Sequence, residues 1–200
     1  DAVIEARDES TIYEVPLLMA DEKLDQVVLK QLNVPVPKTL DLANWKKFLQ
    51  KFQHPKNAVT IGLVGKYVEL KDSYKSISEA FIHAGASNDC KVNIKWIHSE
   101  SINNKNVKQL LGGLNGIVVA PGFGQRGIEG KITAIKFARE NKVPFFGICL
   151  GMQCAVIEFA RNVLGFKGAN STEMDDKTKY PVIHLLEEQR KIVNKGGTMR

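Results

Sequence analysis

Short apolar runs alternate with segments of helical periodicity from residue 58 onward. Apolar runs, or apolar residues alternating with polar ones, predict strands at 58–64, 92–96, 116–120 and 143–148. Apolar positions three or four residues apart predict helices at 73–84, 107–111, 132–139 and 150–163. Strands separated by helices are typical of a mostly parallel sheet covered on both faces, a three-layer α/β fold. In such folds the ligand binds at the carboxyl ends of the strands.

The first 57 residues follow a different pattern. Val34-Pro35-Val36-Pro37 is held extended by its prolines, which is typical of a linker. Asp41 is placed to cap a helix whose apolar residues fall at i, i+3, i+4 and i+7, namely Trp45, Phe48, Leu49 and Phe52. We expect the end of a preceding domain at 1–20, a linker with this amphipathic helix at 21–57, and the α/β domain at 58–200.

Composition narrows the class of protein. The 200 residues are 44% hydrophobic and 25% charged, as in a globular chain that holds one domain and some extra sequence. No apolar stretch approaches the length of a membrane span, and no signal peptide begins the chain, so we expect a cytoplasmic protein with no membrane partner. The net charge of +6 is spread among acidic residues rather than gathered in a stripe, which favours small anions over nucleic acid as ligands.

The three cysteines, Cys90, Cys149 and Cys154, have no metal-like spacing, so neither a disulfide framework nor a metal site is expected. Cys149 differs from the others because it lies in Gly147-Ile148-Cys149-Leu150-Gly151, between a predicted strand and a predicted helix. This is the thiol counterpart of the G-x-S-x-G nucleophile elbow. Amide N–H groups at the first turn of the helix can receive an oxyanion there, and the helix dipole favours a thiolate. The alternative is a small buried residue at a strand end.

The helix alone does not ionise this thiol. A dipole contributes about 0.3–1 kcal/mol, whereas one pKa unit corresponds to about 1.36 kcal/mol, so the pKa falls by less than about one unit from about 8.5. A histidine base is therefore required. None of the four histidines has the sequence context of such a base: His54, His83, His98 and His184.

A glycine-rich segment, Pro121-Gly122-Phe123-Gly124-Gln125-Arg126-Gly127, follows a predicted strand and precedes a predicted helix. An anion-binding or oxyanion loop often has this position. The segment matches neither a Walker A motif nor G-x-G-x-x-G, so spacing alone allows a simple connecting loop equally well.

The elbow together with Met152-Gln153 resembles the nucleophile motif of class I glutamine amidotransferases, and in particular that of the CTP synthase family. Further segments agree with the same family along nearly the whole chain. They are 64–70, 72–76, 123–127, 170–173, 196–200 and, near the start, Arg7-Asp8-Glu9 followed by Ser10-Thr11-Ile12-Tyr13. The resemblance implies a flavodoxin-like class I glutaminase fold.

The resemblance also implies roles for individual residues. Cys149 attacks the side-chain amide of glutamine, and the N–H groups of Gly122 and Leu150 hold the oxyanion. Three further kinds of contact follow from it. The glutamine pocket is formed with Gly151, Met152, Gln153 and Glu173. Contacts to ATP come from Arg7, Asp8 and Glu9. An allosteric GTP site lies near Lys66, Tyr67, Lys75 and Arg126.

In the family, ammonia passes to a synthetase (amidoligase) domain that uses ATP and Mg²⁺ to convert UTP to CTP, and the enzyme is a homotetramer. Two departures are visible. The family's Pro-Gly-Gly-Phe-Gly reads Ala120-Pro121-Gly122-Phe123-Gly124 here, which leaves the amide of Gly122 intact because the proline stands at 121. The family's catalytic His-x-Glu has no counterpart before Arg200, so we expect a glutaminase domain that is incomplete at its C-terminus.

Two other interpretations stay open at this stage. One is the glutaminase part of another class I amidotransferase, such as that of GMP synthesis. The segments around Lys66 and at 170–173 speak against it. The other is a flavodoxin-like binding or assembly module that has no catalytic activity.

Overall fold

The computed structural model describes residues 2–184. Its backbone contacts divide the chain into two compact units. Residues 1–57 and 82–91 form one, called here the helical unit, and residues 58–81 and 92–200 form the other, called the sheet unit. The domain boundaries expected from the sequence, 1–20, 21–57 and 58–200, stay predictions.

The helical unit is made of short helices. They are α1 (Val15–Asp21), α2 (Leu24–Gln31), α3 (Ala43–Gln53) and the C-terminal half of α4 (Lys75–Ser87). The amphipathic helix predicted from the apolar stripe is confirmed as α3, and Asp41 Oδ1 accepts a hydrogen bond from the Ala43 N–H at 2.9 Å. Helices α1 and α2 were not predicted, because each has fewer than nine residues and neither has a side-chain cap.

An aromatic cluster holds the helical unit together. Tyr13 packs edge-on against Phe48, with ring centroids 5.1 Å apart, and its hydroxyl lies 3.1 Å from His83 Nε2. Trp45 donates its indole N–H to the carbonyl of Tyr13 at 2.8 Å, and His83 stacks on Phe48. The stripe of α3 therefore packs against Tyr13 and against the second half of α4.

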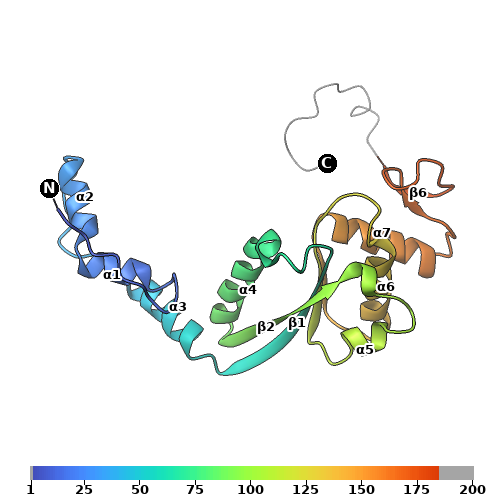
Figure 1. The fold of residues 1–200 in the computed structure, drawn as a ribbon, viewed down its shortest axis with the longest axis horizontal. Coiled ribbons are helices and arrows are strands. Elements are labelled where there is room, and N and C mark those ends of the chain that lie inside the picture. Colours follow the sequence, from blue (N-terminus) through green and yellow to red (C-terminus); the bar gives the residue numbers. More distant parts are fainter. Residues whose placement is uncertain (1, 185–200) are drawn as a thin grey trace, which may run out of the picture. The chain divides into compact units, whose positions relative to one another are not determined.

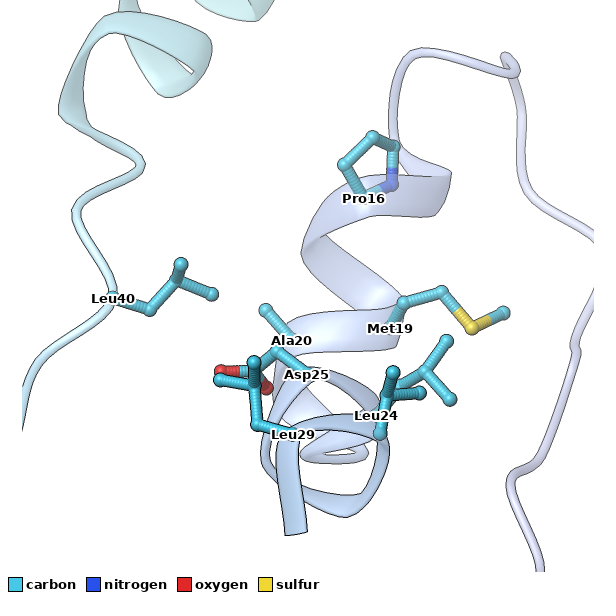
Figure 2. Close-up of a pocket in the computed structure, with 8 residues that line it drawn as sticks. Pro16, Met19, Ala20, Leu24, Asp25, Leu29 and Leu40 are labelled. Carbon is cyan, nitrogen blue, oxygen red and sulfur yellow. The ribbon is translucent and has the colours of Figure 1, made fainter. Parts of the chain in front are cut away.

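The helical unit also has an apolar pocket of about 400 Å³ (Figure 2). Its lining comes from α1, α2 and the segment that leads to α3, namely Pro16, Met19, Ala20, Leu24, Asp25, Val28, Leu29 and Leu40. Asp25 is the single ionisable side chain in this lining, so the pocket lacks the paired acid, base or nucleophile groups of a catalytic site.

The sheet unit has the predicted order of strands and helices (Figure 1). The strands are β1 (Asn57–Gly65), β2 (Cys90–His98), β3 (Gly116–Val119), β4 (Phe145–Gly147), β5 (Asn170–Ser171) and β6 (Pro181–Ile183). The helical segments are η1 (Lys71–Tyr74), the start of α4, η2 (Ser99–Ser101), α5 (Val107–Leu111), α6 (Ile128–Glu140) and α7 (Leu150–Asn162). Within residues 2–184, the larger sheet has the order β2-β1-β3-β4, and β5 pairs with β6 in a smaller one.

Both faces of the larger sheet are covered, which confirms the three-layer fold. Val64 and Val119 point to one face, where they join a core with residues of α5, α6 and α7. The neighbouring residues Leu63 and Ala120 point to the other face and pack with Tyr74 and Ile77 at the start of α4. The alternation between adjacent residues is what a strand buried on both sides produces.

Two boundaries differ from the sequence prediction. Strand β4 contains three residues rather than the six of 143–148, because Val143 and Pro144 lead into it and Ile148 already belongs to the turn before Cys149. Helix α6 begins at Ile128, four residues before its predicted start, since Gly127 adopts a positive φ of 78° and lets the chain enter the helix directly.

A buried ion pair ties α6 to α7. Glu158 is 1% exposed and receives three hydrogen bonds from the Arg139 guanidinium, at 2.8 to 3.2 Å. Glu140 also approaches Arg139, at 3.7 Å, but it lies at the surface with its side chain 50% exposed. The two glutamates therefore offer a matched comparison.

We expect Glu158→Ala to lower the free energy of unfolding by about 1–3 kcal/mol, because the variant loses charge-assisted hydrogen bonds and leaves a cavity. Glu140→Ala should change it by less than about 0.5 kcal/mol. Chemical denaturation of the two variants checks this, and equal losses would show that burial of the pair does not matter.

Candidate active site at the carboxyl edge of the sheet

Three loops meet where parallel strands end. Val64 of β1 pairs with Val119 of β3, and Val119 pairs with Gly147 of β4. The residues that follow these three positions therefore emerge at the same edge of the sheet. They are Lys66 after β1, the loop 120–127 after β3, and Cys149 after β4.

Cys149 sits at a sharp turn into α7. It is the N-cap residue of that helix, and its backbone has φ 54° and ψ −109°, a conformation that residues with a Cβ rarely adopt. Its side chain is exposed. The predicted elbow is therefore present in the structure, with the thiol accessible at the helix N-terminus.

The two glycines of the motif are required by close packing. A Cβ on Gly151 would lie 2.2 Å from the carbonyl oxygen of Val119, and a Cβ on Gly147 would lie 2.6 Å from the carbonyl carbon of Gly151. Neither position has space for another side chain. The glycines thus allow α7 to start directly against β3, which brings Cys149 beside the loop that follows β3.

Two residues near the turn, Gly122 and Leu150, have amide N–H groups that no other described residue engages. Among residues 2–184, no hydrogen bond engages the N–H of Gly122 or that of Leu150. The two residues are neighbours, since a Cβ on Gly122 would lie 3.7 Å from Leu150 Cδ2. Unengaged donors at a helix N-terminus are suited to a negatively charged oxygen.

Two buried lysines lie behind this loop. Lys66 is 5% exposed and donates a hydrogen bond from Nζ to the carbonyl of Phe123. Lys131 is fully buried and donates from Nζ to the carbonyl of Ala120 at 2.8 Å. Burial lowers the pKa of Lys131 to about 8. Sequence reasoning missed Lys131, although a lysine on the apolar face shared by Ile128 and Ile135 was a visible signal.

The other two cysteines have different surroundings. Cys154 is fully buried in the core, and desolvation raises the pKa of its thiol to about 11. Cys90 is half-buried at the start of β2, where its sulfur lies 3.6 Å from the carbonyl oxygen of Lys91. Only Cys149 combines exposure with a helix N-terminus.

A cationic and aromatic group borders the loop. The ring of Tyr67 lies 5.6 Å from Lys66 Nζ and 5.9 Å from the guanidinium carbon of Arg126. Arg126 forms an ion pair with Glu100 at 3.1 Å. Lys75 is exposed and pairs with Glu79 at 2.7 Å, and this hydrogen bond raises the pKa of Lys75.

The remaining glutamine-pocket residues lie on α7 and after β5. Met152 is half exposed, while Gln153 has a buried Oε1 with no partner among residues 2–184. Glu173 is exposed in the turn after β5. Gln125 of the glycine-rich loop donates to the carbonyl of Met174, which ties the loop to the segment that carries Glu173.

Other predicted residues lie elsewhere. Arg7, Asp8 and Glu9 are exposed in the helical unit, and Arg7 approaches Glu5 at 3.9 Å. The motif at 196–200 falls outside the described residues. Across residues 2–184, no cluster of His, Cys, Asp and Glu side chains could hold a metal ion. In the same part of the chain, no helix has both the length and the apolar character needed to cross a bilayer.

Comparison with known proteins assigns the family. The family described as "Glutamine amidotransferase class-I" matches residues 69–200. The chain is 62% identical to the CTP synthase of Flavobacterium johnsoniae and 61% identical to that of Methanocaldococcus jannaschii, in each case over its full length. It spans only 37 and 38% of the length of these two relatives.

A solved structure agrees with this assignment. The Trypanosoma brucei CTPS glutaminase domain with bound acivicin is 38% identical, with a TM-score of 0.61. The likeness covers 64% of this chain and 50% of that one. The match of the family to most of the sheet unit and the high identity to the relatives leave one conclusion: the chain belongs to the class I glutamine amidotransferases.

Proposed function

We propose that this chain is the glutamine-hydrolysing part of a CTP synthase and that Cys149 is its nucleophile. One observation carries the proposal: an exposed thiol lies at a strained strand-to-helix turn next to Leu150, whose N–H, like that of the neighbouring Gly122, has no partner among residues 2–184. A cysteine that only filled space would be buried, as Cys154 is.

In the proposed reaction, the Cys149 thiolate attacks the side-chain amide carbon of glutamine and the carbonyl oxygen becomes an oxyanion. The N–H groups of Gly122 and Leu150 receive this charge. Collapse of the intermediate breaks the C–N bond, and protonation of the nitrogen releases ammonia, leaving a thioester. Water then hydrolyses the thioester to glutamate and restores the thiol. By resemblance to the family, a histidine that is oriented by a glutamate acts as general base.

The glutamine pocket is proposed to extend from the elbow. Met152 and Gln153 follow Gly151 on the first turn of α7. The buried, unpartnered Oε1 of Gln153 is an acceptor that a bound ligand can satisfy. Glu173 supplies a carboxylate suited to the α-amino group of glutamine, and the Gln125 bond to Met174 fixes the turn that presents it.

The synthesis of CTP belongs to the longer protein. We infer that ammonia passes to an amidoligase domain of the same polypeptide, where ATP and Mg²⁺ serve the amination of UTP, in a cytoplasmic homotetramer. Arg7, Asp8 and Glu9 are proposed to contact ATP there. In the structure these three side chains are exposed.

GTP is proposed as an allosteric activator that binds beside the glycine-rich loop. Tyr67 offers an exposed ring for a base to stack on, and Arg126 and Lys75 offer charge for phosphates. Lys66 was expected in the same group. Its ammonium is directed at the Phe123 carbonyl, so the nucleotide contacts are assigned to Tyr67, Lys75 and Arg126.

Replacement of the nucleophile separates the two half-reactions. In the full-length protein, Cys149→Ala should abolish glutamine-dependent CTP synthesis and leave synthesis from added ammonium intact, because ammonia bypasses the glutaminase. Cys90→Ala, which removes a half-buried thiol from β2, should retain both activities. If Cys149→Ala kept glutamine-dependent synthesis, the proposed nucleophile would be wrong.

Alkylation should distinguish the cysteines. At pH 7.5, iodoacetamide should label Cys149 at least ten-fold faster than Cys154, because Cys154 is buried and its pKa is raised to about 11. Peptide mass spectrometry over a time course measures both rates. Comparable rates would mean that Cys149 is not presented at the surface as described.

Removal of the Arg126 charge should weaken GTP activation. A lost charge-assisted contact of about 1.5–3 kcal/mol corresponds to a rise of about 10- to 150-fold in the GTP concentration for half-maximal activation in Arg126→Ala. Lys136→Ala, at a half-exposed position of α6, serves as the control for charge. An unchanged GTP response in Arg126→Ala would remove this residue from the site.

A further inference from the structure

Two buried ammonium groups hold the loop that carries the Gly122 N–H. Lys131 donates to the carbonyl of Ala120, two residues before Gly122, and Lys66 donates to the carbonyl of Phe123, one residue after it. Both side chains lie near the glycine, since a Cβ added to Gly122 would lie 3.4 Å from Lys66 Cε and 3.7 Å from Lys131 Nζ. Both lysines therefore contact the loop at the point where the oxyanion donor lies.

Burial of these two ammonium groups costs free energy of folding, which indicates that the two lysines have a functional role. Burial of an ammonium group is unfavourable unless it is paired, and neither Nζ forms an ion pair with a carboxylate among residues 2–184. The two like charges also oppose each other, and Lys66 contributes to the lowered pKa of Lys131. An apolar side chain at either position would avoid these costs.

The loop needs external restraint because of its own residues. Pro121 has a fixed φ but donates no hydrogen bond, and Gly122 has the widest backbone freedom of any residue. The peptide plane that carries the Gly122 N–H lies between them and is free to turn its N–H away from Cys149. Fixing one carbonyl on each side of that plane limits the rotation.

We propose that Lys66 and Lys131 form a clamp that holds the Gly122 N–H in position to receive the oxyanion formed at Cys149. Both are positioning residues, because they act through the loop carbonyls and not on the substrate. The inference rests on the proposed glutaminase function. It gives Lys66 a role in catalytic geometry instead of nucleotide binding.

Methionine variants test the clamp in the full-length protein. Methionine is close to lysine in length but has no N–H donor, so Lys66→Met and Lys131→Met should each lower kcat for glutamine hydrolysis by about 10- to 100-fold, less than the roughly 10²–10³ lost when an oxyanion donor is removed outright. KM for glutamine should change by less than about three-fold, because the clamp acts on the transition state. Lys95→Met is the matched control, since Lys95 donates to the carbonyl of Leu110 at the exposed surface.

Alkylation of Cys149 by iodoacetamide separates positioning from activation of the thiol. This substitution at a saturated carbon forms no oxyanion, so its rate should be unchanged in both variants while glutamine hydrolysis falls. A parallel fall in alkylation would assign the lysines to ionisation of the thiol and overturn the clamp. Unchanged glutamine hydrolysis in both variants would also overturn the clamp. Loss of ammonia-dependent synthesis in both variants would overturn it too, because the two lysines would then be needed for folding.

The outcome is independent of the nucleophile test. If Cys149→Ala abolishes glutamine-dependent synthesis and both methionine variants retain full hydrolysis, the clamp fails and the proposed function stands. If Cys149→Ala retains glutamine-dependent synthesis, the proposed function itself fails.

Discussion

Parallel pairing of β1, β3 and β4 is the constraint on which the site depends. Because Val64 pairs with Val119 and Val119 pairs with Gly147, the three strands end at the same edge of the sheet. Each strand is then followed by a different functional segment: Lys66, the glycine-rich loop and Cys149. These segments are more than 80 residues apart from first to last, and a shift of register by one residue in any of these strands would turn the side chains of that strand to the other face of the sheet.

The elbow depends on this constraint and adds its own strain. A positive φ at a residue with a Cβ costs about 1–3 kcal/mol, and it persists only where the surroundings hold it. Here the surroundings are the close contact of Gly151 with the Val119 carbonyl and of Gly147 with Gly151. The Cys149 side chain is exposed at this turn, and the N–H of Leu150 has no helical partner because Leu150 is the first residue of α7. Strain, exposure and an available donor thus occur at the same turn.

The sheet unit contains two kinds of buried charged group, an ion pair and two lysines that donate to backbone carbonyls. Between α6 and α7, Glu158 and Arg139 satisfy each other with hydrogen bonds, as a structural ion pair does. Behind the glycine-rich loop, the acceptors of Lys66 and Lys131 within residues 2–184 are backbone carbonyls. The first pair stabilises the packing of two helices, whereas the second adds an electrostatic cost at the place where loop geometry governs chemistry.

The sequence by itself determined the alternation of strands and helices, the stripe of α3 and the elbow around Cys149, because periodicity and the spacing of glycines are local properties. It did not predict α1 and α2, whose few residues are stabilised by packing rather than by caps. It did not show that Lys131 donates to Ala120, or that Lys66 turns inward to Phe123. Those contacts join residues far apart in the chain, and only the parallel sheet decides which strand ends become neighbours.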